Sequence, residues 1–427
     1  MPVTDTIFAL SSGSPPAAIA VVRISGPDAA GALRLLAGRL PPPRRAVSAT
    51  LRDLAGGLLD RALVLWLPGP TTATGEDTAE LHLHGGRAVV AAVDRALARV
   101  PGLRRAVAGE FTRRAFRNGR IDLAEAEGLA DLLQAETELQ RQSALAMAEG
   151  RFSREVSAWR DRLLLHSAEV EAVLDFADED DVAILPDSFT WNLEALRAEI
   201  GERLARPGAE ALREGFRVVL AGPPNAGKST LFNALVESEA AITSPQAGTT
   251  RDVLSRPVGL GGVPFLFLDT AGLRDETGDA IERIGVERAR TALDRADLVL
   301  WLGPAEDCPD GAWLIAAQCD RPEAFPCPAA RHRVSAIAGT GLNALRDDLV
   351  ATARAALPRP GEAALNARQQ RLLGDAEQAL GGAAQLTDPL LIAEHLRLAR
   401  VAFDALLGRT TTEDMLDALF GRFCIGK

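Results

Sequence analysis

Cysteine is scarce in this 427-residue sequence, and long apolar runs are missing from it. The four cysteines, Cys308, Cys319, Cys327 and Cys424, show no CxxC spacing, which argues against a disulfide framework or a thiolate zinc site. No apolar run approaches the roughly 20 residues that span a bilayer. The N-terminal segment MPVTDTIFAL lacks the basic region of a signal peptide. We therefore expect a cytoplasmic protein without a membrane anchor.

The net charge of −11 argues against a protein that coats nucleic acid non-specifically. It does not exclude a nucleic-acid partner that binds to a local basic patch. Hydrophobic residues make up 47% of the chain and charged residues 25%, as in ordinary globular proteins. The length is sufficient for two or three domains.

The chain changes its periodicity along its length. Residues 1–118 mix short strand-like runs with turns, and residues 119–212 show helical spacing of apolar positions. From Phe216 strands and helices alternate, which predicts a mostly parallel sheet in residues 213–357. Helical spacing returns in residues 358–427. We expect a multidomain fold of the α+β and α/β classes, with a phosphate-binding domain between two helical segments.

The segment GPPNAGKS, Gly222–Ser229, matches the phosphate-loop pattern GxxxxGK[ST] between a strand and a helix. Its glycines let successive N–H groups face phosphate oxygens, and the helix N-terminus adds positive potential. Lys228 should reach the β- and γ-phosphates of a nucleoside triphosphate, and Ser229 should bind Mg²⁺.

Two further motifs follow in the order that GTPases use. The segment AGTTRD, about 20 residues on, offers the Thr249 and Thr250 hydroxyls. The segment DTAG follows an apolar strand, so Asp269 falls at the strand end beside the metal and Gly272 can donate its N–H to the γ-phosphate. Leu273 stands where Ras-like proteins have the glutamine that orients water. Glu282 is the candidate replacement; the alternative for it is a solvated helix residue.

The guanine-reading motif departs from its usual form. GTPases carry NKxD after the next strand, and here the segment is AQCD, which keeps only Asp320. The segment VSA then supplies Ser335 and Ala336. The connection from Gly303 to Trp313 is shorter than a parallel crossover with a helix requires. We predict that one peripheral helix of this domain is reduced or missing.

Several segments, among them TGEDTAELHLHGG, GEFTRRAFRNGRIDLAEAEGLADLL, GPPNAGKST, DTAGLRD and the terminal FCIGK, closely resemble the MnmE (TrmE) family of tRNA modification GTPases. The resemblance implies an N-terminal folate-binding and dimerising domain, a helical domain built from both flanks and an inserted Ras-like GTPase domain. It implies a homodimer that acts on tRNA with the flavoprotein MnmG (GidA) in a heterotetramer. The implied reaction adds a carboxymethylaminomethyl-type group at carbon 5 of the wobble uridine, with a 5-formyl or 5,10-methylene tetrahydrofolate as one-carbon donor.

The resemblance also implies roles for individual residues. Glu282 is the catalytic residue for GTP hydrolysis, and Asn225 is a K⁺ ligand in a loop, TSPQAGTT, that departs from the usual TDIAGTT. The implied GTP contacts are Asn225, Ala226, Gly227, Lys228, Ser229, Thr230, Ser244, Thr249, Thr250, Asp269, Thr270, Ala271, Gly272, Asp320, Ser335 and Ala336. Mg²⁺ would bind to Ser229 and Thr250, K⁺ to Asn225, Ser244, Gln246 and Thr249, and the folate to Arg23, Glu80, Arg120 and Lys427.

Two features keep alternatives open. Cys424 is either an inert packing residue or a catalytic thiol near the folate. The basic run FTRRAFRNGR, with Arg113, Arg114, Arg117 and Arg120, either meets tRNA phosphates or a folate polyglutamate tail, or is a solvated helix face. The alternative functions are a regulatory GTPase of the ribosome-assembly type without folate chemistry, and a diverged relative with a weakened nucleotide site.

Overall fold

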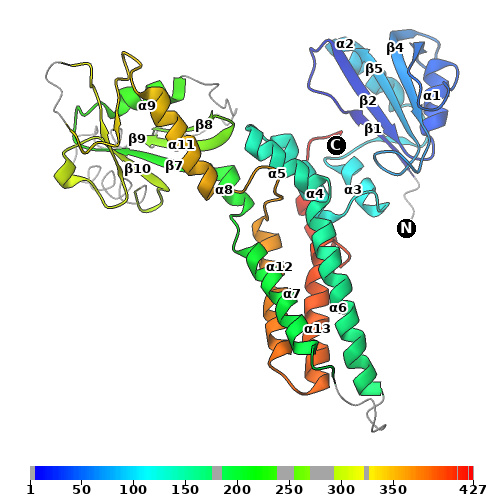
Figure 1. Ribbon diagram of the computed structural model, residues 1–427. Coiled ribbons are helices and arrows are strands. Elements are labelled where there is room, and N and C mark those ends of the chain that lie inside the picture. The colour runs from blue at the N-terminus through cyan, green and yellow to red at the C-terminus, as the bar shows by residue number, and fades with distance from the viewer. Residues whose placement is uncertain are drawn as a thin grey trace, which may run out of the picture. The chain divides into compact units, whose positions relative to one another are not determined.

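A computed structural model describes residues 5–175, 185–237, 254–269, 293–321, 327–410, 412–421 and 423–426. The chain divides into two compact units, Met1–Ala130 with Asp404–Lys427, and Asp131–Phe403 (Figure 1). No helix in the described ranges combines the length and the apolar character that crossing a membrane requires.

The first unit contains a six-stranded sheet of order β3-β4-β5-β2-β1-β6. Its neighbouring strands are antiparallel except for β1 and β6, which are parallel. The strands are β1 Thr6–Leu10, β2 Ile19–Ser25, β3 Val47–Arg52, β4 Leu58–Leu67, β5 Thr78–His84 and β6 Leu103–Arg105. Apolar residues alternate along β2 and β5, and their buried members pack against α1 Ala29–Ala37 and α2 Arg87–Leu97. One face of the sheet is therefore covered by helices.

Three further helices belong wholly or partly to this unit: α3 Glu110–Arg117, α4 Leu123–Gln134 and α14 Glu413–Phe420. Phe420 of α14 is buried against Phe116 of α3, with ring centroids 6.2 Å apart, and Leu123 and Phe423 complete this cluster. The C-terminal residues of the chain are thereby packed onto residues that follow the N-terminal sheet.

A helical bundle forms one part of the second unit. It contains α6 Arg151–Asp175, α7 Phe189–Leu204, α12 Ala367–Ala384 and α13 Pro389–Leu406 (Figure 1). Two shorter helices, α5 Glu138–Ala148 and α8 Ala209–Glu214, contribute buried side chains to the core of the second sheet. The Arg197 guanidinium of α7 lies 2.6 Å from the Glu377 carboxylate of α12, and Trp159 of α6 packs on Phe403 of α13. Helices from before and after the second sheet therefore build one bundle.

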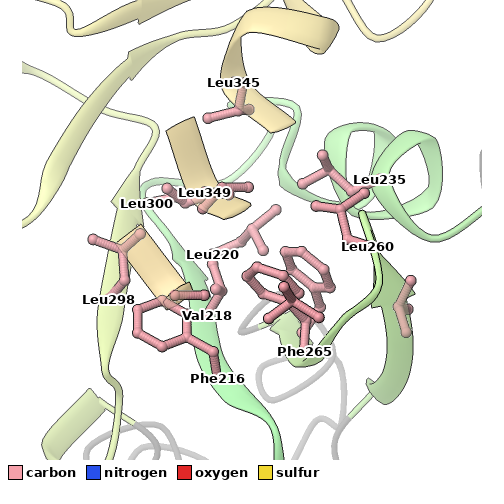
Figure 2. Close-up of a cluster of buried hydrophobic side chains, with 14 of the residues drawn as sticks. Phe216, Val218, Leu220, Leu235, Leu260, Phe265, Leu298, Leu300, Leu345 and Leu349 are labelled. Carbon is pink, nitrogen blue, oxygen red and sulfur yellow. The ribbon is translucent and has the colours of Figure 1, made fainter. Parts of the chain in front are cut away.

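The second sheet has the order β12-β11-β10-β7-β9-β8, parallel except for the antiparallel edge strand β8. Its strands are β7 Phe216–Ala221, β8 Leu254–Leu260, β9 Val263–Asp269, β10 Leu298–Trp301, β11 Trp313–Ala316 and β12 His332–Arg333. Helices α9 Lys228–Glu237 and α11 Leu342–Ala356 pack on it, and Figure 2 shows Leu345 and Leu349 of α11 among the buried side chains of the strands. The parallel order agrees with the alternation of strands and helices in the sequence.

The crossover from β10 to β11 contains only a 3-10 turn at Ala305–Asp307, so the prediction of a reduced helix is confirmed. A hydrogen bond holds the start of this turn to the end of β10: the Trp301 indole N–H donates to the Pro304 carbonyl at 2.9 Å. The ring of Trp313, in the next strand, is covered by the Arg331 guanidinium at 3.9 Å from its centroid.

Candidate functional site

The phosphate loop joins β7 to α9 in a sharply turned conformation. Asn225 has φ 62° and Gly227 has φ 93°, in the left-handed region that asparagine and glycine tolerate best. A Cβ at Gly222 would lie 2.4 Å from the Leu302 carbonyl oxygen, so glycine is required there. The turn exposes backbone N–H groups at the start of α9, which is the arrangement that holds phosphate groups.

Lys228 is held in place by carbonyl groups of this loop. Its side chain is buried, and its ammonium group donates to the carbonyls of Gly222 at 3.0 Å and Pro223 at 2.9 Å. Because the loop fixes the cation in place, little side-chain entropy remains to be lost when a phosphate binds.

The structure brings Ser229 and Asp269 together, as the order of their motifs predicts. The Ser229 hydroxyl donates to Asp269 Oδ2 at 2.6 Å, and Asp269 is fully buried at the carboxyl end of β9. Hydroxyl and carboxylate oxygens are the hard ligands that Mg²⁺ prefers. The two side chains therefore fit a Mg²⁺ site beside the phosphate loop.

The base-reading residues Asp320, Ser335 and Ala336 line one pocket together with Gly227 and Thr230. Ser335 is fully buried, and its hydroxyl accepts the Ala338 N–H at 3.0 Å. A hydrogen bond from Ser335 lowers the pKa of the Asp320 carboxyl, with a smaller contribution from the backbone. Asp320 is thus held ionised, with oxygens that can accept from neighbouring N–H donors.

Part of the expected site falls outside the described residues. These positions are Ser244, Gln246, Thr249, Thr250, Thr270, Ala271, Gly272, Glu282 and Lys427. Of the expected K⁺ ligands, only Asn225 is described.

In the first unit, Arg23 and Glu80 occupy paired positions on the adjacent strands β2 and β5, with a guanidinium–carboxylate distance of 3.0 Å. The second oxygen of Glu80 lies 3.2 Å from the His82 ring nitrogen. The Arg23 guanidinium lies 5.9 Å from the ring centroid of Phe111, close enough for a cation–π contact. The exposed Arg120 shares no hydrogen bond or ion pair with Arg23 or Glu80 in the described part of the chain.

The C-terminal segment lies against the N-terminal sheet. Ile425 forms an isolated bridge with Ala108. Gly426 approaches β1 so closely that a Cβ there would lie 2.1 Å from the Leu10 carbonyl oxygen. Cys424 is exposed within this docked segment. The cysteine therefore belongs to the same unit as Arg23, and its thiol is accessible.

The basic run at α3 is largely neutralised, so neither interpretation from the sequence describes it fully. Arg114 is 2% exposed and pairs with Asp5, Glu76 and Glu110. Arg113 and Arg117 both pair with Glu413 of α14. For Arg114 both the free basic patch and the solvated face are wrong, because it is buried among three carboxylates, Glu110 of the same helix and the distant Asp5 and Glu76.

Sequence reasoning missed two contacts at these sites. One joins Gln318 to the phosphate loop, and its signal was the departure of AQCD from the usual motif. The other places Phe111 beside Arg23; no local pattern indicates it, because the two residues meet only through the fold.

Comparisons with known proteins agree with this architecture. Residues 6–120 match the model for the GTP-binding protein TrmE N-terminus, and residues 123–424 match the model for the MnmE helical domain. The chain is 63% identical over 437 residues to the tRNA modification GTPase MnmE of Novosphingobium aromaticivorans, with all of both chains covered. It is 63% identical over 423 residues to the protein of that name from Erythrobacter litoralis, covering 99% of this chain and 100% of the relative. The chain belongs to the MnmE family of tRNA modification GTPases.

Proposed function

We propose that this chain is the GTP-hydrolysing subunit of a tRNA modification system that adds a carboxymethylaminomethyl-type group at carbon 5 of the wobble uridine. In this proposal it acts in the cytoplasm as a homodimer, together with the flavoprotein MnmG (GidA). The contact of Ser229 with Asp269 beside the phosphate loop supports the nucleotide part, because it brings together a hydroxyl and a carboxylate, the ligand types that Mg²⁺ prefers. Family membership supports the tRNA part.

The residues of the loop have distinct roles in GTP binding. The N–H groups from Asn225 to Thr230 hold phosphate oxygens, and Lys228 neutralises the β- and γ-phosphates. Ser229 and Thr250 would hold Mg²⁺, which would supply positive charge at the phosphates. Asn225, with Ser244, Gln246 and Thr249, would hold K⁺. Asp320 accepts hydrogen bonds from the guanine N1–H and amino group.

Hydrolysis needs a group that orients water, since Leu273 has no polar side chain. We assign this role to Glu282, whose carboxylate can polarise a water directly or through a second water. A Glu282→Ala variant is expected to bind GTP and to turn it over much more slowly. Unchanged turnover would reject the assignment.

The N-terminal unit offers the groups that a folate requires. Glu80 presents a half-buried carboxylate to the donor edge of a pterin, and the cations Arg23, Arg120 and Lys427 suit its carboxylate tail. A 5-formyl or 5,10-methylene tetrahydrofolate would supply the one-carbon unit there. Cys424, exposed on the docked C-terminal segment, is the candidate thiol for the transfer.

The first test is mass spectrometry of tRNA nucleosides from cells that lack the chromosomal copy and carry a variant. Ser229→Ala should leave the wobble uridine unmodified, because the loss of an oxygen ligand weakens Mg²⁺ binding. The exposed Ser188, at the start of α7, makes no side-chain cap bond, so Ser188→Ala should restore modification as the unaltered chain does. A normal profile without any copy of the chain would overturn the proposal.

A second test separates the folate part from the nucleotide part. Calorimetric titration with 5-formyltetrahydrofolate should show weakened binding for Glu80→Gln and normal binding for Glu171→Gln, which changes an exposed carboxylate of α6. Cys424→Ser should retain GTPase activity and lose modification, whereas Cys308→Ser should retain both. Normal modification by Cys424→Ser would remove the thiol from the mechanism and leave GTP hydrolysis unaffected.

A further inference from the structure

Gln318 lines the same pocket as Gly227 of the phosphate loop and Asp320 of the base-reading loop. It is the second residue of AQCD, so it stands where the usual motif has lysine. Its backbone adopts φ 55°, and its side-chain amide donates to the Asn225 carbonyl of the phosphate loop at 3.3 Å. A residue of the base-reading loop is thus bonded to the phosphate-binding loop.

The amide also fits closely over Gly227. A Cβ at that glycine would lie 2.9 Å from Gln318 Nε2 and 3.4 Å from its Cγ. Gly227 and Gln318 both line the pocket that contains Asp320. The absence of a side chain at Gly227 therefore lets the glutamine pack flat against the loop.

The base-reading loop is bonded to a second segment and closed by a turn of its own. The Cys319 N–H donates to the Val334 carbonyl at 3.2 Å, and the Arg321 N–H donates to the Gln318 carbonyl at 3.0 Å. The residue after Val334, Ser335, is fully buried and accepts the Ala338 N–H at 3.0 Å. With Gln318 bonded to the phosphate loop and Cys319 bonded to Val334, the two residues before Asp320 are held in place, which limits how far its carboxylate can move from the phosphate loop.

We infer that Gln318 is a positioning residue for guanine selectivity, which bonds the Asp320 loop to the phosphate loop in place of the missing asparagine and lysine. Guanine presents two adjacent donors to a carboxylate, whereas adenine has no N1–H to offer there. That distinction is useful only when the carboxylate stands at the right distance from the bound phosphates. The inference rests on the proposed guanine-nucleotide site and adds to it the residue that maintains its geometry.

Loss of the bond between Gln318 and Asn225 should weaken binding of the guanine base and leave binding of the phosphates unchanged. We expect Gln318→Ala to lower GDP affinity about three- to tenfold, which is about 0.7–1.4 kcal/mol and matches the net value of one neutral hydrogen bond. Binding of ADP and of pyrophosphate should change less than twofold, because neither uses Asp320. The ratio of GDP to ADP affinity should therefore fall by the same three- to tenfold.

The experiment is competition of GDP, ADP and pyrophosphate against a fluorescent GDP analogue on the full chain with Mg²⁺. Gln318→Glu keeps the shape but sets a carboxylate against the Asn225 carbonyl, so it should lower the ratio at least as much as Gln318→Ala. Gln318→Lys keeps a hydrogen-bond donor for the Asn225 carbonyl and should retain most of the ratio of GDP to ADP affinity. The control Gln385→Ala changes an exposed glutamine at the end of α12 and should match the unaltered chain.

Three outcomes would overturn the inference. The ratio of GDP to ADP affinity could stay unchanged in Gln318→Ala. Alternatively, all three ligands could weaken equally in a variant whose circular dichroism matches the unaltered chain, which would show that the glutamine supports the phosphate loop and not the choice of base. Equal affinity of the unaltered chain for GDP and ADP would show that there is no selectivity to maintain. In that last case normal pyrophosphate binding would still support the proposed role of the phosphate loop. Only the proposed selectivity for guanine would then be wrong.

Discussion

Replacing Leu139 by alanine should destabilise the nucleotide-binding sheet, although Leu139 lies in α5, well before that sheet in the chain. Its side chain is 4% exposed and belongs to the same buried cluster as Phe265 and Leu260. Its N–H donates to the Gly262 carbonyl at 2.9 Å, in the turn between β8 and β9. Helix α5 therefore completes the core of the sheet.

The size of the effect follows from the burial. Removing a buried leucine side chain down to alanine costs about 2–5 kcal/mol, depending on how far the cavity collapses. Collapse is restricted here, because the neighbouring Gln140 amide is bonded to the Leu212 carbonyl at 2.8 Å and holds the helix in place. Even the lower value of about 2 kcal/mol corresponds to about a 30-fold change in an unfolding equilibrium.

Hydrogen exchange followed by mass spectrometry measures the change in stability separately for each domain. A single melting curve of a multidomain chain does not separate the domains. Peptides covering Val263–Asp269 should exchange about 30-fold faster or more in Leu139→Ala. The control Leu133→Ala removes the same atoms from a side chain that is 45% exposed on α4. Its effect on those peptides should stay within about threefold, since little apolar area is lost.

Equal exchange of these peptides in the two variants would refute the reasoning. It would mean that α5 rests on the sheet without contributing to its stability. Faster exchange confined to α5 itself would lead to the same conclusion.

Two other perturbations test the first unit. Gly426→Ala should detach the C-terminal segment, because Gly426 has φ 97° and a Cβ there would lie 2.1 Å from the Leu10 carbonyl oxygen. Carboxypeptidase should then release the C-terminal residues faster than in the control Gly119→Ala. Gly119 also has a positive φ, 66°, but no atom lies near the place of its added Cβ. Burial raises the pKa of the Glu110 carboxyl, but hydrogen bonds, the strongest from Arg104, bring it below its usual value of 4.5. Its contribution to stability is therefore present above pH 4.5 and lost as the pH falls through the lowered pKa. Glu110→Gln should flatten the acid-unfolding curve in that range, and an unaltered curve would contradict the assignment.

Much of the nucleotide site was predictable because its chemistry is local in the sequence. The phosphate loop is one continuous segment between a strand and a helix, and Asp269 follows directly from the end of an apolar strand. The shortened crossover to Trp313 could be predicted by counting residues, since a parallel connection with a helix needs more of them.

The boundaries of the helices were harder to predict from the sequence. The helical spacing predicted for residues 119–212 conceals a break, because α4 ends at Gln134 and α5 begins after Thr137 with a capping box. Thr137 and Gln140 exchange the bonds that start the new helix.

The sequence by itself determined the strand–loop–helix of the phosphate site and the family motifs, since these depend on residues a few positions apart. Only the tertiary structure decided that Arg114 is buried among carboxylates, that Leu139 belongs to the core of the sheet, and that Gln318 bonds to the phosphate loop. Each of these contacts joins residues far apart in the chain. No local pattern specifies such a pair, because it forms only when the strands and helices between its members have packed.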